Sequence, residues 1–97
     1  MATYVSLVNW TEQGVKAFAD SVERGKAATK LIESLGGKFL SIHWTMGTYD
    51  LVAITEFPDD DTASAFALKL GAQGNVRTLT MRAYNADEMA RIIAKTK

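Results

Sequence analysis

The stretch Gly47-Thr48-Tyr49-Asp50 stands between two apolar segments and decides how the middle of the chain folds. Residues Phe39–Met46 and Leu51–Phe57 flank it, and both alternate between apolar and polar side chains for much of their length. Such alternation is typical of strands, and glycine beside small polar residues favours a turn. The sequence therefore predicts a β-hairpin whose connection is Gly47–Asp50.

Upstream of this hairpin, the sequence predicts a strand and then a long helix. Alternation over Thr3–Trp10 indicates the strand, and Thr11 is placed to cap a helix. Residues 12–35 are helical in character, with a break expected near Glu23–Gly25 because glycine weakens helix interiors. The pair Gly36-Gly37 is placed to end the helix.

Downstream, Pro58 ends the third strand, and the aspartates of residues 59–61 supply a cap and first-turn negative charge for a second helix. The sequence then predicts three more elements in order: a helix over Thr62–Ala72, a strand over Val76–Tyr84 and a short helix over Ala86–Lys97. The order β-α-β-β-α-β is that of the ferredoxin-like split βαβ fold of the α+β class. We therefore expect one domain over residues 1–97, with an antiparallel sheet in the order 4-1-3-2, both main helices on one face and a C-terminal tail helix.

Composition excludes several classes of function. The 97 residues carry 11 basic and 11 acidic side chains, so no basic surface for nucleic acid or for an anionic membrane is expected. The absence of cysteine removes disulfides, thiolate nucleophiles and iron–sulfur clusters. No signal peptide and no apolar segment of about 20 residues is apparent, so we expect a soluble cytoplasmic protein. No metal or cofactor is expected.

A polar cluster is expected where the end of the first strand, the hairpin and the start of the fourth strand meet. Asn9, Asp50 and Arg77 share one parity there, which we assign to the side of the sheet that faces the helices. Arg77 is expected to reach toward Asp50, because an arginine fork can donate two parallel bonds to a carboxylate. The cluster either pins the sheet end or belongs to a functional site.

The opposite parity is assigned to a sheet face that the helices leave open. It carries aromatic and hydroxyl side chains, one histidine and one arginine: Tyr4, Ser6, Val8, Trp10, Phe39, Ser41, His43, Thr45, Ala53, Thr55, Thr78, Thr80, Arg82 and Tyr84. Monomers seldom expose so large a patch, so a second copy is expected to pack sheet against sheet and to form a barrel shared by two chains. A ligand cavity is expected between the two sheets.

Three motifs have a functional and a structural interpretation. His43, the only histidine, is a candidate general base or haem ligand, or it forms a hydrogen bond to a neighbouring strand. The run Asp59-Asp60-Asp61 is better explained by helix capping than by a cation site, because consecutive residues rarely converge on one ion. Gly71, Gly74 and Asn75 lead from a helix into a strand, which is the reverse of a phosphate-binding loop.

Two motifs together resemble the GYD domain family. Gly47-Thr48-Tyr49-Asp50 followed by Leu51–Ile54 matches its signature of glycine, any residue, tyrosine and aspartate, and residues 74–84 resemble its last strand. The resemblance spans about Tyr4–Tyr84 and implies a small bacterial or archaeal protein of the dimeric α/β-barrel kind, with no general activity. The family positions present are Gly47, Tyr49, Asp50, Asn75 and Arg77.

Three functions remain open at this point. The first is a homo-oligomeric domain that binds a small molecule through Tyr4, Trp10, His43, Tyr49, Arg82 and Tyr84. The second is a cofactor-free enzyme, similar to an isomerase or monooxygenase, acting on a small aromatic or polyketide-like substrate. In that enzyme His43 or Asp50 would move a proton, Arg82 would steady an anion, and Tyr4 and Tyr84 would orient the substrate. The third is a module that only assembles with itself.

Overall fold

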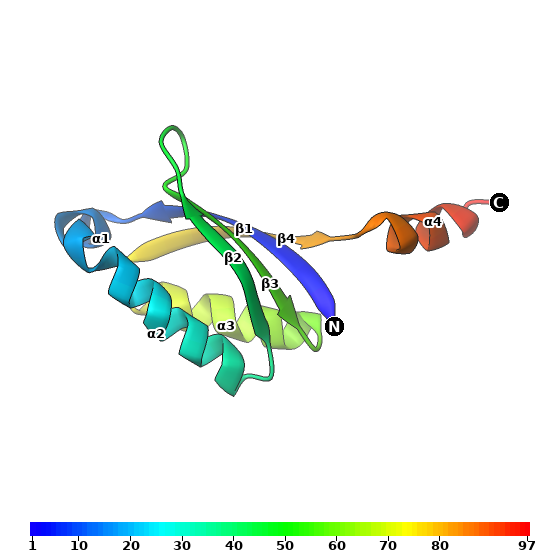
Figure 1. Cartoon of the computed structure of the whole chain (residues 1–97), viewed down its shortest axis with the longest axis horizontal. Helices are drawn as coiled ribbons and strands as arrows, with labels where there is room; N and C mark the ends of the chain where they lie inside the picture. Colours follow the sequence, from blue (N-terminus) through cyan, green and yellow to red (C-terminus); the bar gives the residue numbers. More distant parts are fainter.

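The computed structural model describes all residues from Met1 to Lys97 and forms two layers, a curved sheet and the helices that cover one of its faces (Figure 1). The elements follow in the order β1 (Ala2–Trp10), α1 (Glu12–Lys16), a 3-10 turn η1 (Phe18–Asp20), α2 (Ser21–Ser34), β2 (Lys38–Trp44), β3 (Leu51–Phe57), α3 (Asp60–Ala72), β4 (Val76–Ala83) and α4 (Ala86–Ala94). The predicted α+β class is confirmed. No helix has the length and apolar character needed to cross a membrane.

All strand pairs in the sheet are antiparallel, and their order across the sheet is β2-β3-β1-β4, which reads 4-1-3-2 from the opposite edge. β1 lies in the middle and pairs Tyr4 with Thr55 on β3 and with Arg82 on β4. Helices α2 and α3 lie side by side under the sheet (Figure 1). The arrangement is ferredoxin-like.

Capping side chains begin the helices where the sequence predicts. Thr11 Oγ1 accepts from Gly14 N at 3.1 Å, and Asp59 Oδ1 accepts from Thr62 N at 2.8 Å. Each bond satisfies one of the N–H groups that the first turn of a helix leaves unpaired. Gly36 follows α2 with a φ of 78°, the left-handed conformation that ends helices and that glycine adopts without steric cost.

The break in the first helical segment lies earlier than predicted. The chain leaves the helix at Ala17 and resumes at Ser21, whereas α2 continues through Gly25 without interruption. The guanidinium of Arg24 donates to Gly14 O at 3.1 Å and to Ala17 O at 3.0 Å, so it satisfies carbonyl groups that the end of α1 exposes. No close contact requires glycine at position 25, because a Cβ there would lie 3.8 Å from Ile42, an ordinary van der Waals distance.

The assignment of the two sheet faces was wrong for three of the four strands. Residues predicted on the open face of β1, β3 and β4 lie on the side that α2 and α3 cover, as shown by their burial or their place around the cavity beneath those helices: Tyr4, Ser6, Val8, Trp10, Ala53, Thr55, Thr78 and Thr80. Val52 and Ile54 share the parity of Asp50, which was assigned to the helix side, but they lie on the open face by alternation. Both faces of these strands are rich in apolar residues, so alternation could not show which one meets the helices.

A β-bulge divides β2 into two halves of opposite parity. The register moves from Phe39↔Thr55 to Ser41↔Ile54, so Leu40 is an extra residue in this strand. Phe39 therefore lies on the helix side before the bulge, as Ile42 does after it. Ser41 and His43 pair with Ile54 and Val52 and lie on the open face, as predicted.

Candidate functional site

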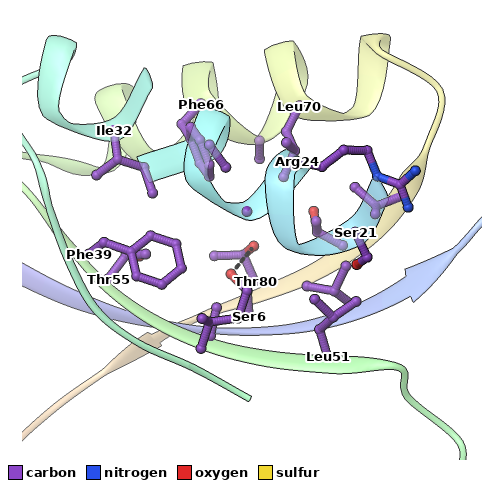
Figure 2. Close-up of a pocket in the computed structure, with 18 of the residues that line it drawn as sticks. Ser6, Ser21, Arg24, Ile32, Phe39, Leu51, Thr55, Phe66, Leu70 and Thr80 are labelled. Atoms are coloured by element: carbon purple, nitrogen blue, oxygen red, sulfur yellow. Dashed lines mark hydrogen bonds between the residues drawn. The ribbon is translucent and has the colours of Figure 1, made fainter. Parts of the chain in front are cut away.

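A cavity of about 90 Å³ lies between the sheet and the two main helices (Figure 2). Four small residues line it, two from α2, one from β3 and one from α3: Gly25, Ala28, Ala53 and Ala67. Larger apolar side chains, among them Ile32, Phe39 and Phe66, form the walls. Mostly apolar walls with few polar groups are typical of small-molecule sites.

Hydroxyl groups supply most of the polarity of this cavity. Ser6 and Thr80 lie on neighbouring strands, and their hydroxyls share a hydrogen bond of 3.0 Å (Figure 2). Thr55 also lines the cavity, and no hydrogen bond of its hydroxyl forms within the chain although the residue is only 4% exposed. Trp10 lines the cavity as well, and its buried Nε1 has no partner. Trp10 Nε1 is thus a buried group without a partner, whereas the Thr55 hydroxyl borders the open space of the cavity.

Three of the predicted ligand-binding residues gather elsewhere, at the end of β4. The guanidinium of Arg82 lies 5.7 Å from the ring centre of Tyr4 and 4.6 Å from that of Tyr84. It also forms an ion pair with Glu88 at 3.4 Å. Cation–π contacts and the ion pair join β1, β4 and α4, so this cluster holds the first turn of α4 against the sheet.

Tyr4 connects that cluster to α3. Its hydroxyl donates to Asp60 Oδ1 at 2.5 Å. Burial and the neighbouring Asp60 carboxylate raise the pKa of Tyr4 to about 12, because both disfavour the phenolate. Tyr4 therefore stays protonated at neutral pH and acts as a hydrogen-bond donor that positions the start of α3.

The candidate catalytic residues do not converge. His43 is exposed on the open face, and Asp50 follows the hairpin beside the end of β1. Arg82 pairs with Tyr4, six residues before Trp10, and six residues of strand span about 20 Å. Tyr49, a predicted ligand residue, lies in the hairpin connection, where its carbonyl accepts from Thr45 Oγ1 at 2.6 Å. Within one chain, Asp50 and Arg82 therefore lie at opposite ends of β1.

Asp50 pins the hairpin to β1. Its Oδ2 accepts from the backbone N–H of Trp10 at 2.9 Å, and its own N–H donates to Val8 O at 2.9 Å. The predicted ion pair with Arg77 does not form, because Arg77 is exposed on β4 and pairs in register with Asn9. The carboxylate of Asp50 thus has a hydrogen-bond partner in the backbone N–H of Trp10 and does not need an arginine.

We expect Asp50→Asn to lower the free energy of unfolding by about 1 kcal/mol, because a charged acceptor bonds more strongly than a neutral amide of the same shape. Urea unfolding followed by circular dichroism measures this change. Glu33→Gln, at an exposed position on α2, is the control and should leave stability within about 0.5 kcal/mol. Equal effects of the two substitutions would remove the structural role of Asp50.

Asn75 joins the start of α1 to the loop before β4. Its carbonyl accepts from Thr11 N at 3.0 Å, and its side-chain Oδ1 accepts from Gln13 Nε2 at 3.0 Å. Gly14 lies so close that a Cβ there would be 1.9 Å from Asn75 O. Asn75 therefore has a packing role, and the requirement for glycine at position 14 was not apparent from the sequence.

The open face of the sheet is aliphatic at its centre rather than aromatic. Cross-strand pairing aligns two rows of side chains, Ile54–Val5–Met81 and Val52–Leu7–Leu79. All six are partly or largely exposed. Asn9, Arg77 and His43 lie on the same face at its edges.

Known proteins share this fold and these motifs. The ferredoxin-like layers and the hairpin motif define a small α+β domain, and the chain belongs to the GYD domain family, whose model matches residues 4–93. A Thermus thermophilus protein named "Glutamine synthetase and cystathionine beta-lyase binding protein" is 30% identical over 94 residues, which are 95% of this chain and 99% of the relative. The crystal structure of a protein from the same organism matches with a TM-score of 0.55 and 24% identity, covering 89% of this chain and 96% of that one.

Proposed function

We propose that residues 1–97 form one homo-oligomeric binding domain, assembled through the open sheet face and holding a small molecule in the cavity beneath α2 and α3. The open aliphatic face is the observation that supports the proposed self-assembly. The cavity, with its unpaired Thr55 hydroxyl, supports the small-molecule role. Assembly and ligand binding then use opposite faces of one sheet.

The central rows of the open face favour a second copy as the covering surface. An aliphatic patch that crosses three neighbouring strands is the kind of surface that monomers seldom leave in water. Two such faces can interdigitate at the spacing of about 10 Å that stacked sheets adopt. Aliphatic side chains would fill this layer, so the ligand site belongs within each chain rather than between the sheets. The resulting assembly is a barrel shared by two chains.

Helix α4 offers a second apolar surface to the same assembly. It projects beyond the end of β4, away from the other helices (Figure 1). Met89, Ile92 and Ile93 are exposed on it, and its start is fixed by reciprocal hydrogen bonds between Asn85 and Glu88. A helix held rigidly in this position loses little conformational entropy when a partner covers it.

We expect Leu79→Arg to convert the oligomer into monomers, because it places a charge in the centre of the aliphatic rows. Size-exclusion chromatography with light scattering measures the molar mass. The control is Leu68→Arg on α3, where the residue is 75% exposed compared with 48% for Leu79, and this variant should keep the wild-type mass. A wild-type protein that is already monomeric, or an L79R variant that keeps the wild-type mass, would overturn the assembly.

Binding to another protein is the second candidate function, and the name of the Thermus relative favours it. The partners that we propose for this chain on that ground are glutamine synthetase and cystathionine β-lyase. If the open face is used for self-assembly, the outer surface of the helices remains for them, and Phe18, Val22 and Leu68 are exposed there. Biolayer interferometry with each purified enzyme tests this role. Binding that is lost in L68R and kept in L79R would place the partner on the helices.

A further inference from the structure

We propose that the cavity binds one uncharged molecule of only a few heavy atoms, smaller than benzene, that carries a hydroxyl or carbonyl oxygen bonded to Thr55. This inference rests on the small-molecule role proposed above and adds the chemical class of the ligand and its position. The ligand would lie at the end of the cavity where Phe39, Phe66 and Ile32 surround Thr55 (Figure 2).

The unpaired hydroxyl of Thr55 fixes the polar end of the ligand. Thr55 is 4% exposed and lines the cavity, and its hydroxyl finds no partner in the chain. This hydroxyl borders the open space of the cavity, so a water or a ligand oxygen there can supply the hydrogen bond that the chain does not. The hydroxyls of Ser6 and Thr80 share one hydrogen bond with each other, whereas Thr55 has none within the chain. A hydroxyl both donates and accepts, so the ligand atom that meets it can be an alcohol or a carbonyl oxygen.

The residues that line the cavity determine the shape of the apolar part of the ligand. Phe39 pairs in register with Thr55, and Phe66 faces them from α3, so two aromatic rings border the same end of the cavity. Flat or branched apolar groups pack favourably against such rings. The cavity volume of about 90 Å³ limits the ligand to a few heavy atoms, since an apolar cavity of about 150 Å³ is known to hold benzene.

The charge of the lining favours a neutral ligand. Arg24 is the only ionisable residue that lines the cavity, and its guanidinium already donates to two backbone carbonyls, Gly14 O and Ala17 O. No second cation is available to compensate a carboxylate placed beside Thr55, and burying an unpaired charge is costly. An anion is therefore disfavoured at this end.

Titrations of the full-length protein with isobutanol, acetone, isobutane and isobutyrate, followed by amide NMR shifts, test the proposal. We expect isobutanol or acetone to shift residues around Thr55. Thr55→Val keeps the side-chain shape and removes the hydroxyl, so it should weaken binding of that probe about fivefold, the worth of one neutral hydrogen bond, and leave isobutane binding unchanged or stronger. Thr3→Val, on the open face of β1, is the matched control and should bind as wild type does.

A second variant tests the position independently of the hydroxyl. Ala67→Leu fills the space between α3 and the sheet and should abolish binding of every probe while the protein remains folded and oligomeric. Tighter binding of isobutyrate than of isobutanol, or equal isobutanol affinity in wild type and T55V, would overturn the ligand class while the cavity remains a binding site. No shift with any probe would overturn both this inference and the small-molecule role, and the oligomer mass would still report on assembly separately.

Discussion

Replacing Phe57 by alanine is expected to lower the free energy of unfolding by about 3–5 kcal/mol. Phe57 is 2% exposed, and its ring centre lies 5.9 Å from that of Tyr4 and 5.4 Å from that of Phe66. Removing the ring leaves a void between β1, β3 and α3, because close-packed neighbours relax only partly. Urea unfolding at one fixed protein concentration measures the change, since oligomer stability depends on concentration.

The control for this prediction is Phe18→Ala, which removes the same side chain from a position that is 64% exposed. Its effect should lie within about 0.5 kcal/mol, as is usual for surface positions. A similar loss of stability in both variants would contradict the core position of Phe57. It would also indicate that Phe18 is covered, which the oligomer or a protein partner could do.

Gly14→Ala is expected to destabilise the protein by about 1–3 kcal/mol, the usual cost of forcing extra atoms into a packed site. The new Cβ would lie 1.9 Å from the backbone oxygen of Asn75, and backbone cannot rotate away as a side chain can. α1 must then move, and the bond from Thr11 N to Asn75 O would lengthen or break. Thermal unfolding by calorimetry measures the effect.

Gly71→Ala provides the opposite expectation within the same chain. Gly71 lies in α3, and a Cβ there would meet no atom within 4 Å. Alanine is the better helix former by about 1 kcal/mol, so this substitution should stabilise the protein. Stabilisation by both Gly14→Ala and Gly71→Ala would show that helix propensity, rather than the contact with Asn75, decides the result at position 14.

The order of the elements could be predicted because local signals mark it. Thr11, Asp59 and Gly36 lie at helix ends for reasons that their neighbours in sequence supply, and Gly47 favours the hairpin connection. The helix break could not be placed correctly, because the side chain that stabilises it, Arg24, comes seven residues after Ala17. A glycine in the sequence determines the position of a helix break less strongly than a side chain that donates hydrogen bonds to the freed carbonyl groups.

The candidate site was predicted less well than the fold. Alternation correctly grouped Tyr4, Arg82 and Tyr84, which the structure brings together. It could not separate the two faces, because Val5 and Leu7 are as apolar as Tyr4 and Val8. In the folded chain, the face that carries the larger rings is the buried one, and there Phe57 packs beside Tyr4. The cavity depends on small residues from three separate elements, and no local pattern reveals that they meet.

The bulge at Leu40 has a consequence for aligning relatives of this protein. Positions 39 and 55 face each other before it, whereas positions 42 and 53 do so after it. A relative that lacks the extra residue would, in an ungapped alignment, match inward-facing positions of this strand with outward-facing ones. Substitution patterns and pairwise covariation along β2 therefore become interpretable only when a one-residue gap is allowed at Leu40.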